Sequence, residues 1–266
     1  VTPPVGFTNY LGATSLSAYS VLVGDYFNIL QKVEGFNTAD LAWGTASASS
    51  ITLSFWVRSS LTGTFGGSIQ NSDQTRSYPF SYTISTANTW EYETITIPGD
   101  TTGTWLTTNG TGLSVIFNLG AGSTFAGTAN AWATANYTNP TGATSVVGTS
   151  GATFYITGVQ LEAGSVATPF ENVDYGEMLR RCQRYYEQSL RNGSTYYLLG
   201  FARSDGYAFE SVYFAAEKRA APTTTFRANT GSIYSTGANT RTAFLILSNL
   251  AGSTSFGFDF IASAEL

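Results

Sequence analysis

The chain has 266 residues, a length that accommodates one or two domains. Hydrophobic residues make up 42% and charged residues only 11%, which excludes a disordered chain and indicates a β-rich protein with a surface of hydroxyl and amide groups. The net charge is −5 and no segment forms a basic stripe, so nucleic acid is not an expected partner. One cysteine and no histidine exclude internal disulfides and histidine-dependent catalysis. No run of about 18 apolar residues is present, so no membrane insertion is expected.

The N-terminal part of the chain is predicted to enter a β domain. Residues 1–18, with Pro3-Pro4 and no clear period, form a connector or a first strand, and residues 19–170 form the domain. Its clearest strand is Ile51–Arg58, in which the odd-numbered residues are apolar and form the core face. Gly63–Ser68 is expected to be a turn or an edge region. Further strands are predicted over Tyr78–Ile84, Trp90–Ile97, Leu113–Leu119 and Phe154–Leu161.

Two features of this domain are irregular. The alternation of Trp90–Ile97 changes parity along the strand, which a bulge or burial on both faces would explain. Gly120–Gly151 is a long stretch of small and polar residues, and its embedded Trp132 and Tyr137 predict an ordered loop. Several strands separated by glycine-rich turns, without helices, predict a β-sandwich.

Residues 171–193 contain the one convincing helix of the sequence. Asp174 is the predicted N-cap and Glu177, three residues later, completes a capping box. Asn192-Gly193 is the predicted end of the helix, because glycine tolerates the left-handed C′ conformation. Cys182 lies inside this helix and is expected to be a buried small hydrophobic residue rather than a reactive thiol. The helix is therefore predicted to join two β domains.

Residues 194–266 are predicted to form a small C-terminal β domain. A domain of this size buries only about 60% of the surface of its unfolded chain and is marginally stable alone. Since it has no disulfide, we expect it to need the junction helix, the first domain or neighbouring subunits. Five strands are predicted, over Tyr196–Phe201, Tyr207–Ala215, Thr223–Phe226, Ala243–Ser248 and Ser255–Ala262.

The aromatic residues are the candidate binding residues, since sugars stack their C–H faces on such rings. Trp56 points away from the apolar face of its strand, beside Arg58. Burial against a second layer or a subunit is the favoured interpretation of this position, and a ligand site on the face of the sheet is the other. Trp105 and Trp132 lie on polar loops, where exposed aromatic residues often mark binding surfaces. Tyr78 and Tyr82 share parity on a neighbouring strand and could extend a groove. The candidate glycan-binding residues are thus Trp56, Arg58, Tyr78, Tyr82, Trp105 and Trp132.

No catalytic residue is predicted. Glu91 and Glu93 share a strand face and could in principle act as a glycosidase pair, but a solvated strand face is the favoured interpretation. No cofactor is expected. A structural Ca²⁺ ion could be bound with the help of Asp73, Asp100 or Glu162, although the alternating spacing of a calcium loop is missing.

Several segments carry a resemblance to a known group of proteins, and together they cover most of residues 19–266. They are GVQLEAGSVATPFE and RCQRYYEQS, the upstream stretches VEGFNTADLAWGTASASSITLSFWVRSSLTGTF, TWEYETITIPGDTTGTW and TNGTGLSVIFNLGAGS, and the downstream KRAAPTTTF and terminal SAEL. The set resembles tail-fibre and related virion proteins of bacteriophages, marine ones especially, and the first two segments resemble the junction of these proteins. The resemblance implies a structural role in the virion, often host recognition, and a trimer. The motif order of the first domain also resembles the jelly-roll sandwich of carbohydrate-binding modules, an analogy of fold alone.

These observations lead to one expected function with two alternatives. We expect a non-enzymatic virion protein, the C-terminal part of a tail fibre, formed by a fragment of a longer polypeptide. It would be a homotrimer that contacts other phage tail or virion proteins and a host surface glycan. A purely structural capsid or tail decoration protein is the first alternative, and a polysaccharide depolymerase is the second.

Overall fold

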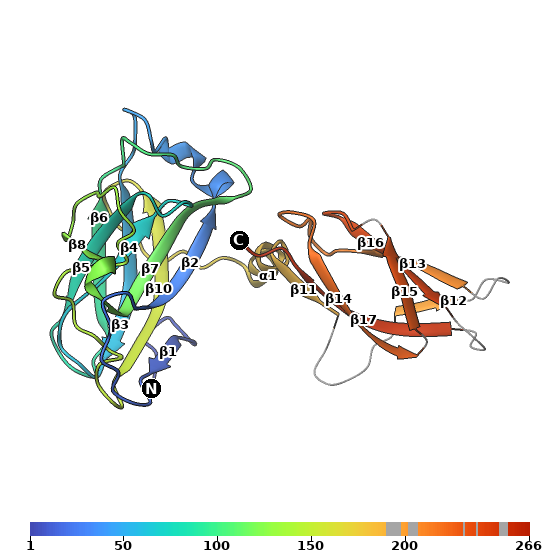
Figure 1. Cartoon of the computed structure of the whole chain (residues 1–266), viewed down its shortest axis with the longest axis horizontal. Helices are drawn as coiled ribbons and strands as arrows, with labels where there is room; N and C mark the ends of the chain where they lie inside the picture. The colour runs from blue at the N-terminus through green and yellow to red at the C-terminus, as the bar shows by residue number, and fades with distance from the viewer. Residues whose placement is uncertain (190–197, 202–206, 231, 238, 250–254) are drawn as a thin grey trace. The chain divides into compact units, whose positions relative to one another are not determined.

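The computed structural model describes the chain except for residues 190–197, 202–206, 231, 238 and 250–254. The chain divides into two compact units, Val1–Glu171 and Asn172–Leu266 (Figure 1). Both are built from antiparallel sheets, and the described part of the chain contains one α-helix. The fold is therefore mainly β, with a jelly-roll-like sandwich, a helix that follows it in the sequence and a small C-terminal β domain, as predicted.

The first unit is a sandwich of two four-stranded sheets. The first sheet contains, in spatial order, β1 (Leu11–Thr14), β10 (Thr153–Ala163), β3 (Ile51–Ser59) and β6 (Glu91–Ile97). The second sheet contains, in spatial order, β2 (Tyr26–Glu34), β7 (Thr111–Ala121), β4 (Gly63–Gln70) and β5 (Ser77–Ile84). Short 3₁₀ turns lie at Gly35–Asn37, Ala39–Leu41 and Ser123–Phe125.

The core of the first unit lies between the two sheets. Ile51, Leu53 and Phe55 of β3 are fully buried, which confirms the predicted core face of this strand. Phe55 meets Phe117 of β7 edge to face, with ring centroids 4.9 Å apart, and so joins the two sheets. Each such side chain contributes roughly 1.5–3 kcal/mol when it is removed from water. With the sandwich interior filled in this way, ligands can reach the sheets only from their outer faces.

Two expectations for the first unit were wrong. The segment predicted as a turn or edge, Gly63–Ser68, belongs to β4, which is paired on both sides, with β7 and β5. Its glycines, read from sequence as turn signals, allow close packing: a Cβ on Gly66 would overlap the ring of Pro140. β6 pairs with β3 in continuous register, so no bulge interrupts it. The odd-numbered residues of β6 lie on one side of the strand, with Glu91 at its start and the buried Ile97 at its end. The apparent change of parity is therefore a change from a charged to an apolar residue along one face.

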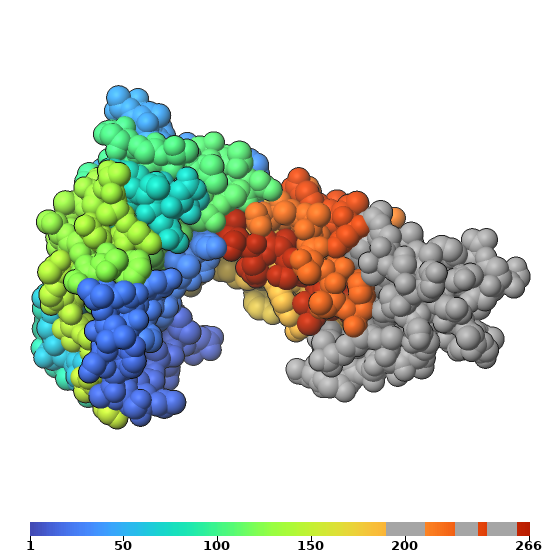
Figure 2. Space-filling model, viewed as in Figure 1, coloured from blue at the N-terminus to red at the C-terminus, as the bar shows by residue number. Residues whose placement is uncertain are grey.

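The long loop of the first unit is ordered, as predicted. It contains β8 (Ala126–Gly127) and β9 (Asn139–Pro140), which pair in parallel. The loop is fixed to the second sheet by backbone hydrogen bonds, among them from Asn130 to Pro79. Near its other end, Val147 accepts a hydrogen bond from the amide of Tyr19, and in Figure 2 the N-terminal segment (blue) and the yellow-green loop form one surface. The loop thus covers part of the outer face of the second sheet.

The second unit begins with α1 (Tyr175–Gln183). The Asp174 side chain accepts hydrogen bonds from the amides of Gly176 and Glu177, which confirms the predicted N-cap. The Glu177 carboxylate does not close a capping box, because it binds Arg180 and Arg181 instead.

The predicted end of the helix was wrong. The helix stops at Gln183, because Tyr186–Gln188 forms β11 and pairs with β17 (Ser255–Ser263), while Asn192-Gly193 lies outside the described residues. Cys182 is exposed rather than buried. The whole helix shares this exposure: α1 has no buried residue, and its Met178 and Leu179 are exposed as well.

The remaining strands of the second unit form two sheets. The first has the order β11-β17-β12, with β14 also paired to β17, and the second has the order β13-β16-β15. Five strands were predicted near their observed positions, whereas β11 and β15 were not. The bounds are β12 (Leu198–Phe201), β13 (Tyr207–Tyr213), β14 (Thr223–Thr230), β15 (Ser232–Gly237) and β16 (Ala243–Asn249). No helix in the described part of the chain is long and apolar enough to cross a bilayer.

Candidate functional site

A groove lies on the outer face of the second sheet of the first unit. It encloses about 510 Å³, within the range of about 300–1,000 Å³ that is usual for ligand sites. Its lining comes from β2 and β7, from the end of β4 with the turn that follows, and from residues 136–138 of the long loop. We call it the sheet groove.

The strand alternation explains why polar side chains floor the sheet groove. Ile29 of β2 and Phe117 of β7 pack into the core, so the even-numbered residues of these strands project outward. Pairing of the strands arranges these outward residues in rows across the sheet. The rows are Lys32–Ser114–Gln70, Leu30–Ile116–Ser68 and Asn28–Asn118.

The amide side chains around the sheet groove are held by hydrogen bonds. Gln70 Nε2 donates to Asn136 Oδ1 at 2.8 Å, and Asn136 Nδ2 donates to Gln74 Oε1 at 2.9 Å. At the other end of the floor, Asn118 Nδ2 donates to Asn28 Oδ1 at 2.6 Å. Side chains that are already fixed lose little conformational entropy when they bind a ligand. The groove is therefore a pre-organised polar surface.

Groups capable of further contacts line the same groove. The Ser114 hydroxyl makes no hydrogen bond within the described part of the chain, although the residue is largely buried. Tyr26 is 54% exposed and its ring is steadied by Phe125, 4.8 Å away edge to face. Phe27 is held in the same way by Tyr19, at 5.4 Å. The groove thus offers polar groups on its floor and aromatic faces at its margin.

The structure places Trp56 and Arg58 on a different surface, the outer face of the first sheet. Trp56 is partly exposed and lies against Tyr92, with ring centroids 5.3 Å apart. Arg58 Nε donates to the carbonyl of Asn88 at 2.8 Å, and its guanidinium lies over the ring of Tyr155. The prediction that Trp56 points away from the core is confirmed by this arrangement, but neither residue lines the sheet groove.

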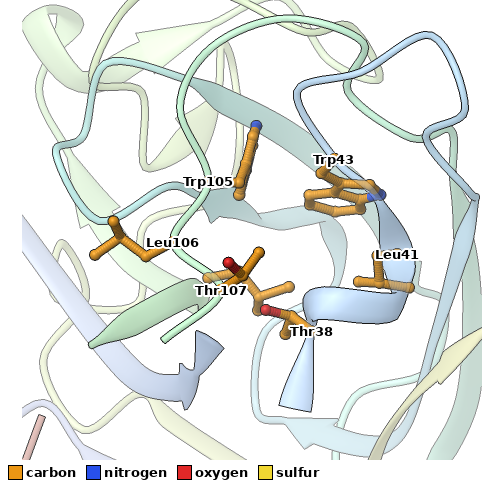
Figure 3. A pocket seen from close by; sticks show the side chains of 7 residues that line it. Thr38, Leu41, Trp43, Trp105, Leu106 and Thr107 are labelled. Carbon is orange, nitrogen blue, oxygen red and sulfur yellow. The ribbon is translucent and has the colours of Figure 1, made fainter. Parts of the chain in front are cut away.

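Trp105 and Trp132 come together around Trp43. The ring centroid of Trp43 lies 4.6 Å from that of Trp105 and 5.4 Å from that of Trp132. Both loop indoles donate to backbone carbonyls, Trp105 to Thr102 and Trp132 to Pro98. The pocket beside Trp43 and Trp105 (Figure 3) encloses about 10 Å³, room for a single water molecule at most. These tryptophans therefore fix loops, and the small pocket beside them is no ligand site.

Tyr78 and Tyr82 do not extend a surface groove, because the even-numbered residues of β5 face the core. Their side chains are 4% and 5% exposed, and the ring of Tyr82 packs edge to face on Phe55. Burial, and then the charge of Glu93, raises the pKa of the Tyr82 hydroxyl. Neither tyrosine can stack on a ligand from outside.

The acidic residues considered as catalysts or metal ligands either have hydrogen-bond partners or do not cluster. Glu91 accepts hydrogen bonds from the amides of Ser85 and Thr86. Burial raises the pKa of Glu93, and the charge of Glu91 adds to this effect. Asp100 is bound by Arg76, and no three Asp, Glu, Cys or His side chains gather as a metal site within the described residues.

Sequence reasoning missed the residues that line the sheet groove. A signal for two of them was present: once Leu113, Val115 and Phe117 were assigned to the core, Ser114 and Ile116 had to face outward. The loose alternation of β2 gave a weaker signal for Asn28. The part contributed by residues 136–138 depends on a long-range contact that no local pattern encodes.

Comparison with known proteins gives no further guide to this site. No protein-family model matches the chain, and no curated protein matches it either. The geometry of the sheet groove and the sequence motifs are therefore the two guides to function.

Proposed function

We propose that this chain is a non-enzymatic component of a bacteriophage virion, the C-terminal part of a tail fibre, and that its first unit binds a host surface glycan in the sheet groove. The observation that carries the glycan proposal is the pre-organised floor of amides and hydroxyls beneath exposed aromatic rings. Sugars present hydroxyl groups to such polar side chains and flat C–H faces to aromatic ones. Asn28, Ser114 and Gln70 would supply the hydrogen bonds, and Tyr26 a stacking face.

The composition of the groove favours binding over hydrolysis. Glycoside hydrolysis needs two carboxyl groups about 5–9.5 Å apart around the scissile bond. No Asp or Glu is among the described residues that line the sheet groove. A depolymerase would need its acids elsewhere, and Glu91 already binds two backbone amides.

The assignment to a virion is supported by the sequence motifs. Residues GVQLEAGSVATPFE and RCQRYYEQS resemble the junction of phage tail fibres, and KRAAPTTTF and SAEL extend the resemblance to the C-terminus. Such proteins are commonly trimers and sit on tail appendages, so we propose a homotrimer located there. Antibody labelling of phage particles in electron micrographs would test the location, and labelling of the capsid surface would contradict it.

Binding by the sheet groove is tested by side-chain removal. The double variant Asn28→Ala, Ser114→Ala should weaken adsorption of the purified protein to host cells or to their extracted lipopolysaccharide at least tenfold. Trp56→Ala, on the outer face of the other sheet, is the matched control and should adsorb like the unmodified chain. Adsorption that survives the double variant and fails in Trp56→Ala would move the site to the first sheet.

A structural decoration role is the second candidate, and one observation favours it. The outer face of the first sheet carries the aromatic pair of Trp56 and Tyr92, and Tyr92 is 45% exposed. Such a face would suit contact with another virion subunit. A copy number in the particle that matches the capsid lattice, together with no adsorption to host surfaces, would support this candidate over the first.

A further inference from the structure

The hydrogen bonds around the sheet groove fix which way its amide side chains face. The backbone amide of Gly120 donates to Asn118 Oδ1 at 2.8 Å, so Nδ2 is the Asn118 group that donates to Asn28 Oδ1. At the other end, the carbonyl of Tyr137 can only accept, and it accepts from Gln70 Nε2 at 2.9 Å. The backbone thus sets the direction of both amide networks.

Each network leaves one group for a ligand on a residue that lines the sheet groove. Asn28 uses its oxygen for Asn118, and its Nδ2 group donates to no residue that the structure describes. Gln70 uses its nitrogen for two bonds, and its Oε1 accepts none from the described residues. Lys32 also lines the groove, but it already has a partner within the chain. The neutral groups that remain are a donor on β2 and an acceptor on β4.

An exposed apolar side chain follows the free donor along β2. Outward residues of one strand lie about 6.5 Å apart, so Leu30 is the next outward neighbour of Asn28. Leu30 is 50% exposed and stands opposite Ile116, which lines the same groove and is 2% exposed. On the other side of Asn28 lies the exposed ring of Tyr26. Along this strand the groove therefore presents an aromatic face, an amide donor and an apolar surface, in that order.

An acetyl group on a sugar matches the donor and the apolar surface together. Its carbonyl oxygen only accepts hydrogen bonds, and its methyl group gains from leaving water. A plain hydroxyl could also accept from Asn28, but it would leave Leu30 without an apolar contact. The hydroxyl groups of the same sugar could meet Ser114 and the Gln70 oxygen, while the ring stacks on Tyr26.

We propose that the sheet groove recognises acetylated sugars, with Asn28 Nδ2 donating to the acetyl oxygen and Leu30 packing against the acetyl methyl group. Amide-linked and ester-linked acetyl groups present the same oxygen and the same methyl group, so both belong to this ligand class. The inference rests on the proposed function, since it names the ligand class for the same site.

The test compares sugars with and without acetyl groups, using the full chain. One pair is a tetramer of N-acetylglucosamine and a tetramer of glucose with the same linkage, in which a hydroxyl replaces each acetamido group. The other pair is the polysaccharide released from host lipopolysaccharide, before and after mild alkali, which cleaves acetyl esters and leaves amides. In at least one pair the acetylated member should bind about fourfold more tightly, the factor that one buried methyl group contributes. The first pair reports amide-linked and the second ester-linked acetyl groups.

Three variants assign the preference to the proposed contacts. Leu30→Ser should reduce it below about twofold, because the apolar surface is lost. Leu22→Ser, at a residue that is 62% exposed and outside the groove lining, is the control and should keep the preference. Asn28→Asp retains the oxygen that accepts from Asn118 but replaces the donor with a carboxylate oxygen. A sugar hydroxyl can donate to that oxygen and an acetyl oxygen cannot, so this variant should remove or reverse the preference.

The outcomes separate this inference from the proposed function. Equal binding within both pairs that still depends on Asn28 and Ser114 would overturn the selectivity and leave glycan binding standing. A preference that persists in both Leu30→Ser and Asn28→Asp would overturn it as well, because the acetyl group would then be recognised elsewhere. Failure to bind any of the four probes would count against the proposed function itself and against the selectivity that rests on it.

Discussion

Arg76 and Asp100 form a buried ion pair that fixes the turn after β4. Their side chains are 12% and 2% exposed. Burial alone would raise the pKa of Asp100, but hydrogen bonds from Arg76 and Thr102 outweigh it, so its pKa lies below the usual value. Arg76 also donates to Thr134 of the long loop, so the pair links the turn to the wall of the sheet groove.

We predict that Asp100→Asn lowers the free energy of unfolding by about 3 kcal/mol at pH 7, because it leaves the Arg76 charge buried without its partner. Since the folded pKa is lowered, the stabilisation is complete above the unfolded value of about 3.9 and is lost as pH falls through the folded pKa. Urea unfolding at pH 7 and near pH 2.5 should therefore show a difference that shrinks in acid. Asp40→Asn, at an exposed acid, is the control; an equal loss in both variants would contradict the prediction.

Single residues also mark what the sequence could reveal. The outward direction of Trp56 follows from the clean alternation of its own strand, and it is observed. Applied to β5, the same reasoning places Tyr78 and Tyr82 in the core, because they share parity with Phe80 and Ile84 while the alternate positions carry serine, proline and threonine. The prediction of a groove there was wrong because it grouped the two tyrosines without their apolar neighbours on the same face.

At the scale of elements, three separated motifs meet at the C-terminal end of α1. Lys218, from KRAAPTTTF, donates to the carbonyl of Gln183 and, at 2.7 Å, to the carboxylate of Glu187. Its neighbour Arg219 donates to the carbonyl of Ala264, in the terminal SAEL. The Lys218 side chain is 0% exposed and lies over the ring of Phe214. The motifs that carry the family resemblance therefore build scaffold.

We predict that Lys218→Met destabilises the second unit by about 3 kcal/mol or more, since it leaves the Glu187 carboxylate largely buried and unpaired. Hydrogen exchange of the full chain should show faster exchange in peptides covering α1 and residues 260–266, with no change in the first unit. Glu217→Gln, which removes an exposed ion pair with Arg241, should change exchange little. Uniform acceleration in both units would mean that the two do not unfold separately.

Elements with strict alternation or a clear cap could be predicted from local signals, whereas β4 and the end of α1 could not. Ile51–Ser59 and the start of α1 carry local signals, and both are observed. β4 was missed because its glycines, which suit turns, are needed here for contact with Pro140. The end of α1 was misplaced because Tyr186–Gln188 pairs with β17, about 75 residues later in the chain, and local helix signals do not register such a partner.

At the scale of the whole molecule, the fold class could be predicted from composition and turn spacing, whereas the position of the sheet groove could not. A β-sandwich needs only strands with one buried face, and the sequence shows these. The sheet groove needs, in addition, a loop of residues 122–152 that crosses back over the second sheet and places Asn136 beside Gln70. That contact spans 66 residues and is set by the assembled sheet.

The two-unit organisation predicts how binding and assembly divide along the chain. The whole sheet groove is lined by residues 26–138, inside the compact unit Val1–Glu171. A domain of about 150 residues buries close to 70% of its unfolded surface and folds without support. The second unit exposes Tyr175, Met178 and Leu179 on α1, a face suited to the subunit contacts of the proposed trimer.

We therefore expect a fragment of residues 1–171 to fold cooperatively as a monomer and to bind a short oligosaccharide as tightly as the full chain does. On a surface coated with the polysaccharide, the full chain should bind at least tenfold more tightly than the fragment, because linked sites raise the effective concentration. Light scattering gives the two masses, calorimetry the oligosaccharide affinity, and surface binding the gain. Equal surface affinities together with a monomeric full chain would exclude the trimer, whereas a fragment that folds and loses oligosaccharide binding would show that the groove needs the second unit.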